Sequence, residues 1–194
     1  LRAGGFTITV AIHHDRETGR PTLIDARAGI DETLYGIAVD IGSTTIACHL
    51  VDLRTGDTVQ SAGIANPQIR FGEDLMSRVS YVMMNPGGQA ELTNAVRAAV
   101  NALVAEVTGQ AGLTPNDVLD AVFVANPIMH HLFLGIDPTE LGGAPFALAA
   151  SQALDVAARD LGLQVHAGAR AYMLPAIAGY VGADAAAVAL AELG

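Results

Sequence analysis

The run DIGSTT, which begins at Asp40, carries the groups that a polyphosphate site needs. Gly42 has no Cβ, so the backbone can turn sharply there and come close to a ligand. The hydroxyl and N–H groups of Ser43, Thr44 and Thr45 can converge on an anion. Asp40 can hold Mg²⁺ through a water molecule beside the phosphates. The run therefore predicts a loop that binds nucleotide phosphates, and an ordinary hairpin turn with polar residues is the alternative.

The basic residues limit the kind of nucleotide site that the chain could contain. All ten are arginine, so a Walker-type loop, which needs a lysine, is excluded, and so is Schiff-base chemistry on lysine. The net charge of −10 argues against binding to nucleic acids and to anionic membranes. The longest weakly polar stretch, Met173–Leu190, contains Asp184 and many small residues, which argues against a membrane span.

The cysteine and histidine content argues against a metal centre built from these side chains. The single cysteine, Cys48, excludes a disulfide and also an iron–sulfur cluster with its usual four protein ligands. Cys48 is expected to be a small buried side chain in a strand, and a reducing cytoplasm is the expected setting. Adjacent His130 and His131 would point about 100° apart on a helix, so we expect one buried and one exposed rather than a shared metal. The pair at His13 and His14 has still less support as a ligand set.

The phosphate motif must be positioned by the segments on either side of it, and both have patterns typical of strands. We expect strands at Tyr35–Ile41, Thr44–Leu53 and Thr58–Ala65, with a turn at residues 54–57. Tight turns between the three would make an antiparallel meander. A location between two hydrophobic strands favours the phosphate loop over an ordinary polar turn.

After the meander, helical patterns alternate with single strands. We expect helices at Glu73–Met83, Glu91–Val107, Pro127–Leu134, Ser151–Leu161 and Gly182–Leu193, and strands at Asp120–Ala125 and Ala169–Leu174. Apolar residues four apart in the second helix are typical of an amphipathic helix. A meander followed by alternating helices and strands predicts an α/β fold, a ribonuclease H-like lobe.

The residues before the meander predict a small β-hairpin. Strand patterns at Phe6–His13 and Thr22–Arg27 flank a turn, and we interpret this hairpin as the end of a preceding module. The chain would then divide into residues 1–34 and a main domain of residues 35–194. Because it begins with Leu1 and ends in a helical pattern, we expect it to be a fragment of a longer polypeptide.

Four separated segments resemble the reductive activators of corrinoid proteins. Gly36–Thr45 is similar to the first phosphate motif of the superfamily that contains acetate kinase, sugar kinases, heat-shock chaperones and actin. Asn66–Asp74, Met129–Gly135 and Leu174–Asp184 narrow the resemblance to the corrinoid activators. The four segments occur in the order in which the family has them, and the resemblance covers roughly residues 35–194.

The resemblance implies an ATP-driven redox function. Members of the family carry a [2Fe–2S] ferredoxin-like domain, a linker region and a two-lobed ATPase domain. They use ATP to drive an electron onto cob(II)alamin in a corrinoid protein, which restores cob(I)alamin for methyl transfer. This chain would contain the end of the linker region and the first ATPase lobe, with ATP and Mg²⁺ at the phosphate motif. The [2Fe–2S] cluster and the second lobe would lie outside it, so the catalytic residues stay unassigned and the fragment alone is expected to be inactive.

The segment after the third expected strand is polar and follows a strand end near the presumed nucleotide cleft. Candidates for phosphate sensing or for contact with the corrinoid protein are Asn66, Gln68, Arg70, Glu73 and Asp74. A solvated ion pair of Arg70 with Glu73 or Asp74 is the alternative. Farther along, Asn126 lies in an Ala-Asn-Pro string where the family more often has a Gly-Asn-Thr-like string, which leaves its role open.

Gly179, Gly182 and Asp184 lie in a small-residue segment that resembles the helix between the two lobes in this superfamily. Small residues let helices approach closely and slide during a lobe movement, so we expect a hinge here. The alternative is an alanine-rich core helix whose positive N-terminal end favours Asp184.

Two other functions on the same fold stay open. A small-molecule kinase would need a general base near an acceptor pocket, and no such set is evident in this segment. The second open function is that of a non-catalytic lobe that senses nucleotide. The oligomeric state also stays open, a homodimer through the linker region included. The phosphate loop itself would be ruled out if Ser43 to Thr45 packed inward, with their amides already bonded and no open cavity beside Asp40.

Overall fold

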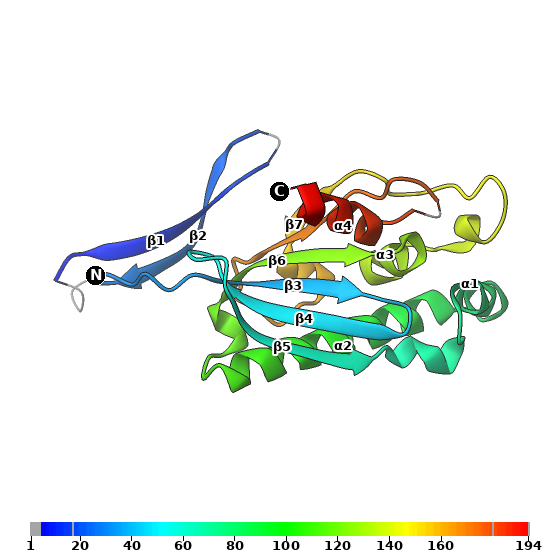
Figure 1. Cartoon of the computed structure of the whole chain (residues 1–194), viewed down its shortest axis with the longest axis horizontal. Coiled ribbons are helices and arrows are strands. Elements are labelled where there is room, and N and C mark those ends of the chain that lie inside the picture. Colours follow the sequence, from blue (N-terminus) through cyan, green and yellow to red (C-terminus); the bar gives the residue numbers. More distant parts are fainter. Residues whose placement is uncertain (1–4, 17, 180, 194) are drawn as a thin grey trace.

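The computed structural model describes residues 5–16, 18–179 and 181–193, and its main body is a six-stranded mixed sheet (Figure 1). The strands are β3 (Tyr35–Ile41), β4 (Thr45–Asp52), β5 (Thr58–Ala65), β6 (Val118–Ala125), β7 (Leu154–Ala157) and β8 (Arg170–Met173). Their order across the sheet is β5-β4-β3-β6-β8-β7. β6 runs parallel to β3 and β8, whereas the other neighbouring strands pair antiparallel. The predicted α/β fold with an antiparallel meander is confirmed.

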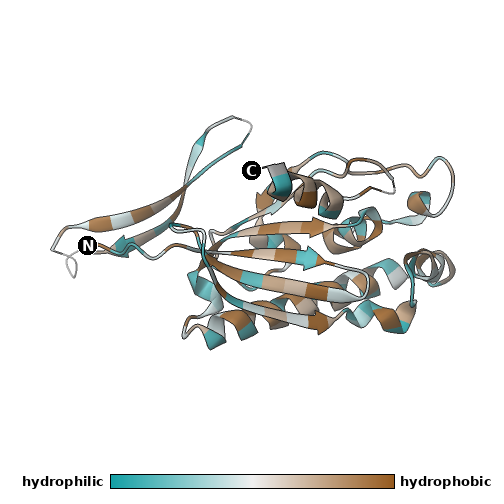
Figure 2. Ribbon diagram, viewed as in Figure 1, coloured by the Kyte–Doolittle hydropathy of each residue, from teal (hydrophilic) through white to brown (hydrophobic). Residues whose placement is uncertain are grey.

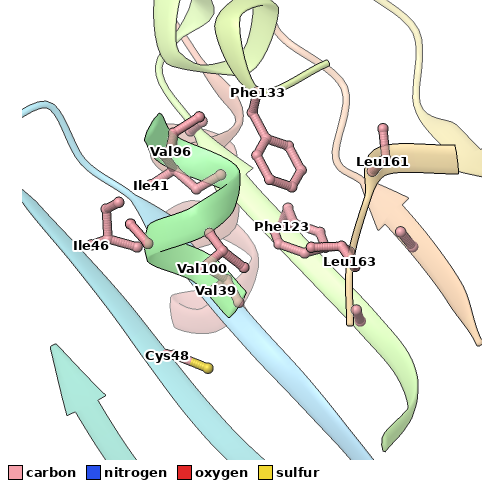
Figure 3. Close-up of a cluster of buried hydrophobic side chains, with 14 of the residues drawn as sticks. Val39, Ile41, Ile46, Cys48, Val96, Val100, Phe123, Phe133, Leu161 and Leu163 are labelled. Atoms are coloured by element: carbon pink, nitrogen blue, oxygen red, sulfur yellow. The ribbon is translucent and has the colours of Figure 1, made fainter. Parts of the chain in front are cut away.

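One face of the sheet packs on the long helix α2 (Gly88–Gln110). Successive side chains of a strand point to opposite faces, so Val39 and Ile41 of β3 are buried on the same side. α2 contributes an apolar stripe to this core that includes Val96 and Val100 (Figure 3). Figure 2 shows many brown segments in the central strands and alternating brown and teal along α2. The amphipathic helix expected in this region is confirmed, with ends slightly beyond the predicted ones.

Shorter helices complete the lobe. They are α1 (Leu75–Met84), α3 (Pro127–Leu134) and α4 (Ala183–Leu193), together with 3₁₀ turns η2 (Pro67–Phe71), η3 (Pro115–Asp117), η4 (Thr139–Gly142) and η5 (Ala158–Leu161). α3 begins directly after β6, because the Asn126 side chain accepts a hydrogen bond from Met129 N at 3.0 Å and caps the helix. Phe133 of α3 packs on Phe123 of β6 with ring centroids 4.7 Å apart (Figure 3). Among the described residues, no helix has both the length and the apolar character needed to cross a membrane.

The first described residues form a separate two-stranded hairpin, called the arm here, made of β1 (Ile8–His14) and β2 (Pro21–Ala28). The arm projects beyond one end of the sheet (Figure 1). Both strands contact the lobe: His13 Nε2 of β1 lies 2.9 Å from Asp155 Oδ2, and Asp25 Oδ1 of β2 lies 3.6 Å from His166 Nε2. The predicted hairpin is confirmed.

A cavity of about 720 Å³ lies between the arm and the lobe. Its lining includes Leu34, just before β3, and Asp120, near the start of β6. Since these residues lie at the opposite end of the strands from the loop after β3, this cavity is separate from the predicted phosphate site.

The helix predicted at Ser151–Leu161 is wrong. Residues 154–157 form the edge strand β7, which pairs with β8. The Asp155 side chain and carbonyl each accept a hydrogen bond from Arg170 at 2.8 Å. Pairing with a neighbouring strand therefore decides the conformation of a segment whose local pattern fits a helix as well.

The helix predicted at Glu73–Met83 begins at Leu75, after the turn η2. The Asp74 side chain accepts a hydrogen bond from Ser77 N at 2.7 Å, which caps α1 at that point. The cap therefore fixes the direction in which α1 leaves the end of the meander.

Candidate functional site

The predicted phosphate loop connects β3 to β4 and lies at the end of two buried strands. β3 ends at Ile41 and β4 begins at Thr45, so residues 42–44 form the connection. Ile41 and Ile46 are fully buried on either side of it. Thr44 and Thr45 are exposed, and Ser43 is half-buried. The loop is thus held on a rigid base with its tip open to solvent.

Gly42 occupies a position where a side chain does not fit. A Cβ added at this residue would lie 2.5 Å from the carbonyl oxygen of Thr45, well inside the normal contact distance. The close approach of these two backbone segments therefore requires glycine, as the sequence predicted for a sharp turn.

The carbonyl groups of the loop point into the protein. Gly42 O accepts a hydrogen bond from Asn66 Nδ2 at 2.8 Å, and Thr44 O accepts one from Asn66 N at 2.8 Å. Between them, Ser43 O accepts a hydrogen bond from Arg78 Nη2 at 2.6 Å. Three consecutive carbonyls are therefore fixed by donors from Asn66, which precedes η2, and from Arg78 of α1.

The N–H groups of the same peptide units face the other way. In a trans peptide the carbonyl and the N–H point in opposite directions, so the N–H groups of Ser43, Thr44 and Thr45 point away from Asn66 and Arg78. Within the described residues, the N–H groups of Ser43 and Thr44 and the hydroxyls of all three residues donate to no protein acceptor. The loop therefore offers unused donors of the kind that bind an anion.

Asp40 is the second-to-last residue of β3, on the face of the sheet away from α2. Its carboxyl is exposed and forms no ion pair with a described residue. Desolvation by the surrounding atoms raises the pKa of Asp40, and the negative charge of Asp184 on α4 raises it further. Two carboxylates near each other favour a cation between them or in water beside them, which fits the chemistry of Mg²⁺. No group of three or more His, Cys, Asp and Glu side chains suited to a metal ion occurs in residues 5–16, 18–179 and 181–193.

The buried polar residues behind the loop form one connected network. Asn66 Oδ1 accepts from Gln68 N at 2.9 Å, and Gln68 Nε2 donates to Leu92 O of α2 at 2.9 Å. Arg78 Nη1 lies 3.3 Å from Gln68 Oε1. Asn66, Gln68 and Arg78 are each at most 1 % exposed. The network therefore ties the loop to η2, α1 and α2.

Two of the five coupling candidates lie inside this network. Asn66 and Gln68 are buried in this arrangement, so their exposed surface offers little to a partner protein, and a coupling role for them stays a prediction. Because they contact the loop directly or through the network, a role for them in sensing bound phosphate stays a prediction.

The other three candidates are at the surface. Arg70 lies over the ring of Phe71, with the guanidinium carbon 4.6 Å from the ring centre. Glu73 is exposed, and Asp74 is exposed and caps α1. Of the ion pairs formed by described residues, none joins Arg70 to Glu73 or Asp74. A partner contact by this exposed group stays a prediction.

The predicted hinge glycines both lie against backbone. A Cβ at Gly182 would lie 2.5 Å from Ala125 O, and one at Gly179 would lie 2.5 Å from Phe146 O. The start of α4 is therefore pressed against the end of β6, beside the loop. Tyr180, which completes the motif between them, lies outside the described residues. A hinge movement stays a prediction.

The adjacent histidines of α3 differ from the expectation. His130 and His131 are both buried, so the predicted exposed histidine is wrong. His131 is bonded through Nδ1 to Pro127 O at 2.8 Å and through Nε2 to Ala149 N at 3.1 Å. Neither ring nitrogen of His130 has a hydrogen-bond partner among the described residues. Burial lowers the pKa of His130 to about 4, so the ring is neutral at physiological pH. Cys48 is buried as expected.

Arg78 is the site residue that the sequence interpretation missed. It follows Leu75 by three residues and precedes Val82 by four, so it lies on the same face of α1 as these half-buried side chains. An arginine among apolar residues at helical spacing was the available signal.

Comparisons with known proteins agree on one group. A family model described as the RACo middle region matches residues 35–193. The corrinoid activation enzyme RamQ of Eubacterium limosum is 31% identical over 160 residues, which cover 82% of this chain and 27% of that protein. A solved structure described as a reductive activator for corrinoid, iron-sulfur protein aligns with a TM-score of 0.86 and 33% identity, over 94% of this chain and 29% of that one. The chain therefore spans less than a third of the length of these relatives.

Proposed function

Since the chain belongs to the RACo middle region family, we propose that it is the part of a corrinoid reductive activator that binds the phosphates of ATP. The observation that carries the proposal is the loop after β3. Its carbonyls are fixed inward, the N–H groups of Ser43 and Thr44 and the loop hydroxyls donate to no described acceptor, and Asp40 lies in the adjoining strand. Such a loop binds an anion through backbone dipoles and needs no lysine.

ATP and Mg²⁺ are the proposed ligands of this site. Ser43, Thr44 and Thr45 would donate to the phosphates, and Asp40 would hold Mg²⁺ through water. The negative charge of Asp184, close to Asp40, supports a bound cation at this edge of the sheet. The proposed division of the chain is residues 1–34 as the end of a linker region and residues 35–194 as the first lobe of the ATPase domain.

The whole protein would use ATP to return a corrinoid cofactor to its active state. The proposed reaction is the one-electron reduction of cob(II)alamin to cob(I)alamin in a corrinoid protein of a methyltransferase system. The single cysteine of this chain means that a [2Fe–2S] cluster with four cysteine ligands must bind elsewhere in the polypeptide. The proposed role of this lobe is therefore to bind nucleotide and change conformation. Another domain of the same protein would supply the electron, and the proposed location of the protein is the cytoplasm.

The test replaces Asp40 in the full-length protein. We expect Asp40→Asn to lower MgATP-dependent formation of cob(I)alamin in the partner by roughly tenfold or more, because the carboxylate orients the water around Mg²⁺. The absorbance of the corrinoid measures the product, and ATP hydrolysis is followed in parallel. Unchanged rates in Asp40→Asn would refute the assignment of this loop.

The matched control is Asp57→Asn. Asp57 is an exposed aspartate in the turn between β4 and β5, at the other end of β4 from the loop. We expect this variant to keep both activities. Phosphorylation of a small molecule, with no effect on the corrinoid, would instead favour a kinase on the same fold.

A further inference from the structure

Arg78 is a buried cation without a carboxylate partner. It is 0% exposed and is the largest of the fully buried side chains. None of the ion pairs formed by described residues includes it. Asp74, whose charge acts on Arg78 from a distance, uses its carboxylate to cap α1. Buried charges are normally neutralised by an adjacent opposite charge, so this arrangement needs an explanation.

The acceptors around the guanidinium are all neutral. Nε donates to Gly72 O at 3.0 Å, and Nη1 lies 3.3 Å from Gln68 Oε1 and 3.2 Å from Met129 Sδ. Nη2 donates to Ser43 O at 2.6 Å, which is the shortest of these contacts. The guanidinium is therefore held in place by its neighbours, but its positive charge is not cancelled by them.

The hydrogen bond from Arg78 to Ser43 O also affects the N–H group on the outward side of the same peptide unit. Ser43 C=O and Thr44 N–H belong to the same peptide unit, and a charged donor on the carbonyl polarises the whole unit. Thr44 N–H is one of the groups that donates to no described acceptor. Arg78 therefore makes this N–H a stronger donor and directs it out of the protein, where a phosphate would bind.

The charge itself also reaches the loop. In a low-dielectric interior a unit charge is screened much less than in water, so an unneutralised guanidinium raises the potential on the far side of a single peptide unit. An anion bound there would be the missing counter-charge. A chain without lysine has few other ways to place a positive charge under a triphosphate.

We propose that Arg78 is the positioning cation of the phosphate loop: it fixes the Ser43–Thr44 peptide from behind and supplies the charge that lysine supplies in other phosphate loops. The inference rests on the proposed binding of ATP at this loop. It assigns Arg78 no contact with the nucleotide and no part in electron transfer.

The test compares ligands that differ in phosphate charge. Full-length protein is titrated calorimetrically with MgATP, MgADP and adenosine, for the wild type and for Arg78→Met. We expect Arg78→Met to weaken MgATP by roughly tenfold or more, MgADP by less, and adenosine hardly at all. Retained adenosine binding shows that the variant is folded. Equal weakening of ATP and adenosine, or no weakening of ATP, would overturn the proposal.

Two further variants keep the test decisive. Arg97→Met is the matched control, because Arg97 also donates to a neutral carbonyl, Phe133 O at 2.9 Å, but has no contact with the loop. We expect it to bind all three ligands as the wild type does. If Arg78→Met does not fold, Arg78→Lys is used, and we expect ATP to weaken roughly threefold relative to adenosine, because lysine keeps the charge but loses the fork of donors. An unchanged ratio would count against Arg78.

The wild type separates this inference from the proposed function. If the wild type binds ATP no better than adenosine, the phosphate loop itself fails. If it prefers ATP and the Arg78 variants share that preference, the loop stands and only the role of Arg78 is lost.

Discussion

The carbonyl of Thr45 leaves no room for a side chain at residue 42. An added Cβ would lie 2.5 Å from that oxygen, which is backbone and cannot rotate away. We expect Gly42→Ala to displace the loop, to lower the free energy of unfolding by about 1–3 kcal/mol, and to abolish measurable ATP binding. Calorimetry and urea unfolding measure the two effects.

The control for Gly42 is a glycine with free space. A Cβ at Gly109, an exposed residue of α2, would meet no atom within 4 Å. We expect Gly109→Ala to stabilise the protein by about 0.5–1 kcal/mol and to leave ATP binding unchanged. ATP binding by Gly42→Ala at wild-type affinity would show that the loop tolerates a side chain and is no close-approach site.

His130 makes the stability of the lobe depend on pH. Its ring is 1% exposed, both nitrogens lack partners, and burial lowers its pKa from 6.5 to about 4. A base with a lowered pKa in the folded state contributes stability above its unfolded pKa and loses it as the pH falls toward the folded value. The loss accumulates between about pH 6.5 and 4 and amounts to about 3 kcal/mol in full.

We expect His130→Met to remove most of this dependence without loss of stability at neutral pH. No hydrogen bond to a described residue is broken, because the His130 ring forms none, and methionine fills the space with an apolar side chain. Urea unfolding at pH 7.5 and pH 5 measures the difference. His131→Met is the control and should be destabilised at both pH values, since it loses the contacts to Pro127 O and Ala149 N. An identical drop for His130→Met and the wild type would assign the acid sensitivity to other groups.

The residues of the site divide into those that the sequence predicted and those that it could not. The loop residues were predicted because their chemistry is local: a glycine, three hydroxyls and a carboxylate lie within six positions. Arg78 was missed because it lies 35 positions from Ser43 in the chain. Its contact with that residue depends on how α1 is placed after η2, and short-range patterns contain no such information.

At the scale of elements, the strands of the meander could be predicted because their buried residues give a recognisable pattern in the sequence. β3 and β5 have the predicted ends, because alternating buried residues and tight turns mark strands locally. β7 was predicted as helix because its four residues gain their conformation from pairing with β8 and from Arg170, a partner distant in sequence. Strands that are marked by a local sequence pattern were thus predicted correctly, whereas β7, which depends on pairing with β8, was not.

Under the proposed function, nucleotide at the loop would act on α4, the proposed hinge to a second lobe. α4 starts at Ala183, one residue after Gly182, whose backbone touches the end of β6. Asp184 lies in its first turn and acts electrostatically on Asp40. A cation bound near Asp40 would therefore attract the start of α4 as well, and α4 is the element that we propose as the hinge between lobes.

At the scale of the whole molecule, the proposed reaction needs a large conformational free energy. Each ~23 mV of unfavourable one-electron potential costs about 0.5 kcal/mol, so a gap of a few hundred millivolts costs several kcal/mol. ATP can supply this only if it favours one conformation of the complex over another. Under the proposed function, the lobe would have to be connected firmly to the part of the protein that contacts the electron donor and the corrinoid protein.

The arm, which we propose as the end of a linker region, is held on the lobe by polar contacts. His13 lies 2.9 Å from Asp155, and the Arg16 guanidinium lies 4.1 Å from the centre of the Tyr172 ring. If the arm transmits the movement of the lobe, loosening it should uncouple ATP hydrolysis from reduction. We expect the double variant His13→Ala/Arg16→Ala to hydrolyse ATP within about twofold of the wild type, because these residues are remote from the loop.

The same variant should form cob(I)alamin less efficiently, by roughly fivefold per ATP hydrolysed, because part of the free energy no longer reaches the partner. Parallel assays of phosphate release and corrinoid absorbance in the full-length protein give this ratio directly. His14→Ala is the control, since His14 is the exposed neighbour of His13 on the same strand and should leave the ratio unchanged. A double variant with a normal ratio would mean that the arm only spaces the two parts, and that the movement is transmitted through α4 and the second lobe instead.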